Sequence, residues 1–145
     1  MAITQAIANA FKKQLLEGDA NFASGGDKFK LALYTSSATL NSATTSFTTT
    51  NEVANSGAYT SGGGDLAGQN TSVASGVAIV DFADLSFTGV TLTARGALIY
   101  NTSSAVTNAA VAVLDFGADK TATSGTFTVQ FPAFTTSAAI LRISG

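Results

Sequence analysis

Apolar side chains near the start of the chain recur at intervals of four residues. They are Ile3, Ile7, Phe11 and Leu15. This spacing is close to the period of an α-helix, so it places the four side chains on one face and predicts a helix over residues 3–17. Thr4 is a candidate N-terminal cap. Gly18 stands where a left-handed residue commonly ends a helix.

After Gly18 the apolar positions alternate with polar ones, as expected for β-strands that have one buried face. We expect strands at residues 29–34, 77–82, 85–87, 90–100, 109–116, 126–131 and 138–144. Gly96 is a candidate β-bulge, and the almost wholly apolar 109–116 segment predicts a strand buried on both faces. The short connections predict a mainly β fold: a β-sandwich or β-barrel of about seven or eight antiparallel strands with one N-terminal α-helix.

The chain is short enough for one domain over residues 1–145, with three parts of different character. Residues 1–18 form the helical part, and residues 77–145 hold most of the predicted strands. Between them, residues 35–70 are rich in Thr, Ser and Gly and low in charge. An irregular excursion of this length is commonly a functional or mobile segment, so we expect residues 35–70 to contribute a contact surface.

The composition removes most catalytic chemistry. The 145 residues include no Cys and no His. A thiol nucleophile, a disulfide and a zinc site of Cys and His ligands are therefore excluded. A Ser–His–Asp triad and a histidine general base are excluded as well. We expect a protein that is not an enzyme and that has no cofactor and no metal site.

The charge pattern points to protein partners. Only 11% of the residues are charged, and they comprise seven Lys and Arg and nine Asp and Glu. Nucleic-acid binding needs a clustered basic surface, so we expect no nucleic-acid partner. No apolar run approaches the roughly 18 residues of a transmembrane helix, and no basic segment precedes an apolar one as in a signal peptide. A surface this poor in charge suits a protein that packs against copies of itself or against a partner.

A few charged residues are candidates for special roles. Arg95 lies within a predicted strand and is expected to pair with Asp81 or Asp115, or else to place a charge across a subunit interface. Asp81 with Asp84, and Asp115 with Asp119, are close enough in sequence to suggest a Ca²⁺ site. No established Ca²⁺-loop spacing accompanies them, so the favoured interpretation is that these carboxylates shape turns.

Two other features allow a binding role. Tyr34, Tyr59 and Tyr100 are candidates for carbohydrate binding by a receptor- or glycan-binding β-domain, although the chain has no Trp. Residues 62–64 are three consecutive glycines, but no phosphate-binding motif surrounds them. A flexible turn is the favoured interpretation of these glycines.

Several segments, in order along the chain, resemble small virion proteins of tailed bacteriophages. They are the opening MAITQAIANAFKKQLLEG and then FKLALYTSSATL, VDFADLSF, TARGALIYN, VAVLDFGADKT and TFTVQFPA. The resemblance covers nearly the whole chain. It implies a β-rich structural component of the virion, assembled in the cytoplasm of the host bacterium, with no catalytic activity. It supplies no site motif to map onto this sequence.

The size, the low charge and the missing chemistry favour a head decoration (cement) protein that binds the capsid lattice. The expected partners are further copies of this chain, in a homo-oligomer such as a trimer, and the major capsid protein. Many equivalent contacts of modest strength would then give high avidity. The expected contact residues are Ile3, Ile7, Phe11, Leu15 and Arg95. A tail or fibre-associated component, such as a tube, adaptor or ring protein, is the main alternative.

Overall fold

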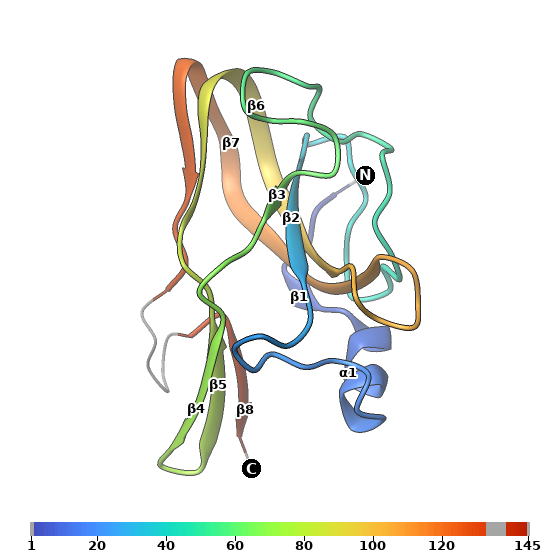
Figure 1. The fold of residues 1–145 in the computed structure, drawn as a ribbon. Coiled ribbons are helices and arrows are strands. Elements are labelled where there is room, and N and C mark those ends of the chain that lie inside the picture. The colour runs from blue at the N-terminus through green and yellow to red at the C-terminus, as the bar shows by residue number, and fades with distance from the viewer. Residues whose placement is uncertain (1, 133–138, 145) are drawn as a thin grey trace.

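Nine elements make up the fold in the computed structural model, which describes residues 2–132 and 139–144. They are β1 (Ala6–Ile7), α1 (Asn9–Leu16), β2 (Phe29–Tyr34), β3 (Gly64–Asp65), β4 (Asn70–Ala74), β5 (Val77–Asp81), β6 (Leu85–Asn101), β7 (Ala109–Val129) and β8 (Leu141–Ser144). The strands form two antiparallel sheets in a sandwich-like arrangement that does not close into a barrel (Figure 1). The predicted mainly β fold with one N-terminal helix is confirmed, in its sandwich form.

The larger sheet has five strands in the order β1-β7-β6-β2-β3. Its central strand, β6, pairs with β2 in register from Phe29 opposite Asn101 to Tyr34 opposite Gly96. All residues of β2 except the half-buried Lys30 are buried, so both faces of this strand are covered. The bounds predicted for this strand, residues 29–34, agree with the structure.

The longest strands, β6 and β7, form one long hairpin within the larger sheet. They have 17 and 21 residues, and both fold over at the top of Figure 1. The register shifts at several points, among them Phe87/Val90 and Ala94/Gly96. A bulge bends a strand without ending its pairing. For this reason the two short strands predicted at 85–87 and 90–100 are one continuous strand, β6, in the structure. The two predicted at 109–116 and 126–131 are likewise joined in β7.

Gly96 marks one of these shifts, as predicted, and the reason is close packing. A Cβ atom at this position would lie 2.9 Å from Cγ2 of Ile3, and still closer to the backbone carbonyl of Leu114. Only glycine therefore leaves room for the N-terminal segment to cross the sheet here.

The N-terminal helix is shorter than predicted. It covers Asn9–Leu16, whereas residues 3–8 are extended. Ile3 forms a parallel bridge with Leu40, and β1 pairs with the apolar part of β7. The residue before the helix is Ala8, which makes no side-chain cap hydrogen bond, so the predicted cap at Thr4 is wrong. Pairing with neighbouring strands gives the backbone N–H and C=O groups of this segment hydrogen-bond partners more favourably than an isolated helical turn would.

The end of the helix agrees with the prediction. Gly18 has a φ of 76°, and its N–H donates to the carbonyl of Leu15 over 3.3 Å. A left-handed glycine directly after the last turn satisfies carbonyls that the helix itself leaves open.

The smaller sheet has three strands in the order β4-β5-β8. Val73, Ala78 and Ile143 lie side by side across it, so they share one face. The β4–β5 hairpin extends away from the larger sheet in Figure 1, with β8 beside β5. The last predicted strand, at residues 138–144, begins at Leu141 in the structure, and residue 138 lies outside the described residues.

Aromatic rings join the helix to the two sheets. Phe22 stacks on Phe29 with ring centroids 4.5 Å apart, and it meets Phe11 of α1 edge-on at 5.7 Å. Phe29 in turn contacts Phe82, which follows β5, at 5.8 Å. These edge-to-face and stacked contacts add to the burial of the rings themselves, so the cluster holds three separate parts of the chain together.

Candidate interaction surface

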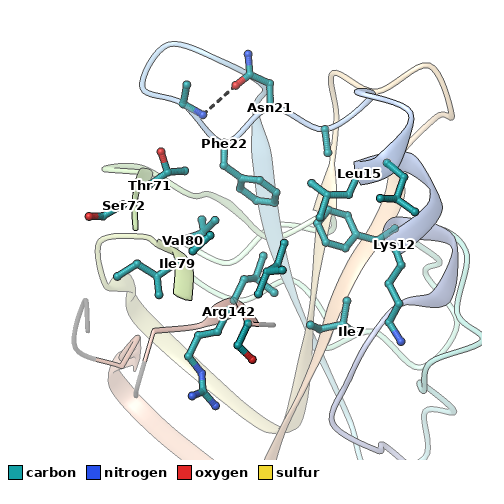
Figure 2. Close-up of a pocket in the computed structure, with 18 residues that line it drawn as sticks. Ile7, Lys12, Leu15, Asn21, Phe22, Thr71, Ser72, Ile79, Val80 and Arg142 are labelled. Carbon is teal, nitrogen blue, oxygen red and sulfur yellow. Dashed lines mark hydrogen bonds between the residues drawn. The ribbon is translucent and has the colours of Figure 1, made fainter. Parts of the chain in front are cut away.

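An apolar groove lies between α1 and the smaller sheet (Figure 2). Its volume is about 700 Å³. Figure 2 shows Leu15 on the helix at one side, Val80 on β5 at the other, and the ring of Phe22 between them. Ile7 also lines the groove, because β1 brings the chain into position directly before α1.

The rim of the groove exposes large apolar side chains. Leu16, at the end of α1, is 90% exposed, and Ile143 on β8 is 58% exposed. Val73, on the far strand of the same sheet, is 70% exposed but does not line the groove. A single exposed apolar residue is ordinary, but exposed residues that rim an apolar groove indicate a binding surface.

The charges that line the groove have one sign. Among its described lining residues, the charged ones are Lys12 on α1 and Arg142 on β8. Both side chains extend toward the same end of the groove in Figure 2. The groove therefore combines apolar walls with a local positive potential, in a chain whose formal net charge is −2.

The structure separates the contact residues expected on one helical face. Phe11 is on the helix and buried in the core, while Ile7 and Leu15 are half-buried at the groove. Ile3 is buried away from the helix, against Gly96 of β6. Sequence reasoning missed Leu16 and Ile143, because no period in the sequence distinguishes an exposed apolar residue from a buried one.

Arg95 is paired within the chain. Its Nε lies 3.1 Å from Oδ1 of Asp115 on the neighbouring strand, which settles the choice between Asp115 and Asp81. The backbone N–H of Gly117 and the Arg95 guanidinium together lower the pKa of the Asp115 carboxyl. The pair is only partly buried, so its contribution to stability is about 1 kcal/mol or less.

Two of the other carboxylates singled out in the sequence, Asp81 and Asp84, accept backbone hydrogen bonds. Asp81 accepts from the N–H of Phe82 over 2.9 Å, and burial raises the pKa of its carboxyl. Asp84 accepts from the N–H of Phe131 over 2.8 Å, which ties the end of β7 to the start of β6. No three metal-ligating side chains gather within residues 2–132 and 139–144. The geometry agrees with the turn-shaping interpretation.

The three candidate tyrosines are structural anchors of the 35–70 excursion. All are at most 3% exposed, which argues against stacking of a sugar on their rings. The Tyr34 hydroxyl donates to the carbonyl of Thr48, and the Tyr100 hydroxyl donates to the carbonyl of Gly62, each over 2.6 Å. Burial raises the pKa of each phenol, that of Tyr100 to about 12.

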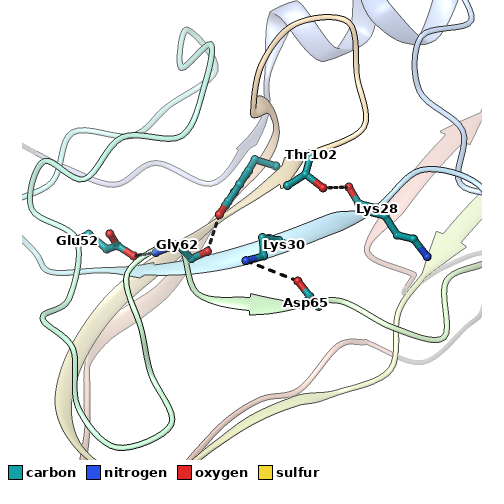
Figure 3. Close-up of polar contacts among 7 residues, drawn as sticks. Lys28, Lys30, Glu52, Gly62, Asp65 and Thr102 are labelled. Carbon is teal, nitrogen blue, oxygen red and sulfur yellow. Dashed lines mark hydrogen bonds and ion pairs between the residues drawn. The ribbon is translucent and has the colours of Figure 1, made fainter.

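The Glu52 carboxylate accepts a second set of hydrogen bonds within the excursion, of which Figure 3 shows the one from Gly62. It accepts from the hydroxyls of Tyr59 and Ser61 and from the N–H of Gly62, each over 2.7 Å. Figure 3 also shows the weaker ion pair between Lys30 and Asp65, at 3.7 Å. The three glycines at 62–64 thus form a turn, which is held by the hydrogen bond from the N–H of Gly62 to the Glu52 carboxylate. The excursion is an ordered layer over the larger sheet.

No helix in the part of the chain that the structure describes is long and apolar enough to cross a membrane. No protein-family model, no curated protein and no solved structure matches this chain. The interpretation of the groove therefore depends on its own residues.

Proposed function

We propose that this chain is a non-enzymatic structural protein of a tailed-bacteriophage particle, and that it decorates the head by binding the capsid lattice. The observation that carries the proposal is the open apolar groove, with Leu16 and Ile143 exposed at its rim. A partner that fills the groove would remove this apolar surface from water. The low charge of the chain supports the same conclusion, because it leaves little to oppose close packing against a neighbour.

The expected strength of one contact is modest. Full burial of a Leu or Ile side chain contributes about 1.5–3 kcal/mol. Association costs on the order of 4–15 kcal/mol in lost translational and rotational freedom. A groove rimmed by Leu16 and Ile143 therefore binds tightly only as part of a larger interface or of a repeated array. A capsid lattice offers such an array, and a homo-oligomer of this chain would engage several sites at once.

The ordered excursion supports a contact role as well. Its backbone is held by Tyr34, Tyr100 and Glu52, while many of its Thr and Ser side chains are exposed. A surface that is already ordered loses little conformational entropy when it docks. We therefore expect residues 35–70 to present a preformed polar surface to a neighbouring subunit.

A sedimentation experiment tests the proposal. The purified chain is mixed with empty heads assembled without it and, separately, with isolated tails, and bound protein is measured after gradient centrifugation. The proposal predicts saturable binding to heads at a number of copies set by the lattice. Binding to tails alone would contradict the decoration role and favour a tail tube, adaptor or ring component.

A further inference from the structure

A second pocket lies on another face of α1, between the end of the helix and the loop that joins β6 to β7. Its volume is about 550 Å³, and it shares no lining residue with the apolar groove. Gln14, Glu17 and Asp19 line it on the side of the helix, and Ala105 and Val106 line it on the side of the loop. It is therefore a separate site, built by a different part of the chain.

The carboxamide of Gln14 is the unusual group in this pocket. Gln14 is only 7% exposed, yet within residues 2–132 and 139–144 its side chain has no hydrogen-bond partner. Burial of an unpaired polar group opposes folding. Every fully buried side-chain N or O atom of the described residues does have a partner, so the Gln14 carboxamide still meets solvent, and this pocket is the cavity that it lines. The fold thus leaves a hydrogen-bonding group for a ligand.

The charge around Gln14 is negative. Glu17 and Asp19 contribute two carboxylates to the pocket and Lys13 contributes one cation, which leaves one net negative charge. The Lys13 Nζ lies 2.9 Å from Oε2 of Glu17, so these two charges offset each other and the carboxylate of Asp19 is the remaining one. The last turn of α1 adds the negative end of the helix dipole. A cationic ligand is favoured at such a site.

The groups of the pocket are held in position by hydrogen bonds. The N–H of Asp19 donates to the carbonyl of Gln14 over 2.9 Å, and Oδ1 of Asp19 accepts from the N–H of Ala105 over 3.1 Å. On the loop, the Ser104 hydroxyl donates to the carbonyl of Val106 over 2.7 Å. Val106 is 49% exposed and offers an apolar surface beside the polar groups. Because the site is already ordered, a ligand loses little affinity to the ordering of the protein.

We propose that this pocket binds the guanidinium group of an arginine side chain on a partner protein. A guanidinium carries a positive charge and five N–H donors, so it has donors both for the carboxamide oxygen of Gln14 and for the carboxylate of Asp19. The aliphatic part of the arginine would pack on Val106. A lysine ammonium is more strongly hydrated and loses more on entry. The inference goes beyond the proposed function and does not depend on the groove.

The lining favours an arginine within a protein over a free amino acid. Among the described residues that line the pocket, Lys13 is the only cation, and it is paired with Glu17. The carboxylate of free arginine would therefore meet negative charge at this site without a cation to offset it. In a protein chain that carboxylate is absent, because it forms part of a peptide bond.

A titration followed by nuclear magnetic resonance tests the recognition on the full chain. The probe is N-acetyl-arginine methylamide, which presents the side chain as a protein does. We expect saturable shifts of the Gln14 side-chain amide and of the N–H groups of Asp19 and Ala105, with a Kd on the order of 1 mM. The citrulline and lysine analogues should bind about fivefold more weakly or less, and free arginine should bind no more tightly than the probe.

Each other result would overturn part of the proposal. No binding of the probe, or shifts confined to other parts of the chain, would remove the site. Equal binding of the citrulline analogue would remove the role of charge, and equal binding of the lysine analogue would remove the preference for guanidinium. Tighter binding of free arginine would overturn the assignment to a partner protein.

Two variants locate the binding within the pocket. Gln14→Met removes the carboxamide, and Asp19→Asn removes the charge but keeps an oxygen for the N–H of Ala105. Each should weaken the probe about fivefold or more. Asp65→Asn and Gln130→Met are the matched controls, because both residues are exposed and lie outside the pocket, and they should leave the affinity unchanged. Unchanged affinity in either pocket variant would contradict the role given to that residue.

Thermal unfolding separates a binding role of Gln14 from a structural one. Because the fold gives the carboxamide no partner, Gln14→Met should leave the midpoint of unfolding unchanged or raise it, while the affinity for the probe falls. A marked drop in the midpoint would show that the carboxamide supports the fold and would overturn its assignment to a ligand.

Discussion

The two sheets differ in how completely they are covered. In the larger sheet, β2 is paired on both sides and buried on both faces, and the tyrosine hydroxyls beside it have partners in the excursion. In the smaller sheet, every residue of β4 is exposed, and β8 opens onto an apolar groove. A small sheet needs a hydrophobic face or packing against a helix for independent stability. The comparison places the stability of the fold in the larger sheet, and the surface proposed to bind a partner beside the smaller one.

The aromatic cluster explains how the open region persists. Phe82 directly follows β5 and packs against Phe29, so the base of the smaller sheet is fixed to the core of the larger one. Among the described residues, no such cover lies over the distal part of the β4–β5 hairpin or the rim of the groove. Apolar side chains can therefore stay exposed there without loosening the rest of the fold.

Alkaline pH should produce the largest loss of stability, and this loss should come from the larger sheet. Burial raises the pKa values of Tyr34, Tyr59 and Tyr100 above the ordinary value of 10.0, that of Tyr100 to about 12. Because the folded-state pKa is raised, the neutral tyrosines contribute their full stabilisation of the fold below pH 10, and this contribution is lost as the pH rises toward and past 12. In that window each tyrosine lowers the free energy of unfolding by about 1.4 kcal/mol per pH unit.

Urea unfolding at a series of pH values measures this loss, with phenolate absorbance as a second signal. We expect the absorbance and the unfolding transition to appear together above pH 10. Titration of all three tyrosines near pH 10 in a folded protein would contradict their burial.

Truncation of a core ring should have the next largest effect. Phe29→Ala is expected to lower the free energy of unfolding by about 3–5 kcal/mol, because it leaves a cavity where Phe22 and Phe82 now pack. Ile143→Ala, at the groove, should change it by less than about 0.5 kcal/mol. Urea denaturation of both variants provides the measurement, and similar losses at the two sites would remove the distinction between the regions.

Loss of the Glu52 carboxylate should have an intermediate effect. Glu52→Ala removes the acceptor of three hydrogen bonds and leaves the buried Tyr59 hydroxyl with a poorer partner, at a cost of about 2–3 kcal/mol. Asp65→Ala is the control, because it breaks only the exposed pair with Lys30 and should cost about 1 kcal/mol or less. Hydrogen exchange should show faster exchange across residues 52–66 in the first variant and unchanged exchange there in the second.

A small effect on stability is expected from Leu16, one of the residues proposed to bind the partner. Leu16→Asp changes a side chain that is 90% exposed, so the midpoint of thermal unfolding should stay within a few degrees of the original. The same variant should lose binding to empty heads in the sedimentation experiment. A large drop in the unfolding midpoint would show instead that Leu16 supports the fold.

Local signals in the sequence predicted some of these features well. Alternation alone located residues 29–34 as a strand, a single glycine marked the bulge at Gly96, and Gly18 marked the end of the helix. The sequence limits the partner of Arg95 to Asp81 or Asp115. The register of β6 and β7 brings Asp115 next to Arg95. In each case a short-range rule of backbone or charge was sufficient.

The remaining features depend on contacts between distant segments. The spacing of Ile3 and Ile7 fits a helix, but Leu40 and β7 draw this segment into extended pairing. β4 contains only one large apolar residue, Val73, so no alternating pattern in the sequence predicts this strand. The groove itself arises from α1, β5 and β8, which come together only in the folded chain, so no local motif could reveal it.

Cryo-electron microscopy of the intact particle would test the binding role of the groove most directly. The expected result is this chain at lattice positions on the head, with the groove between α1 and the smaller sheet turned toward a capsid subunit and covered by it. A chain located on the tail, or a head-bound chain whose groove is empty and faces solvent, would contradict it.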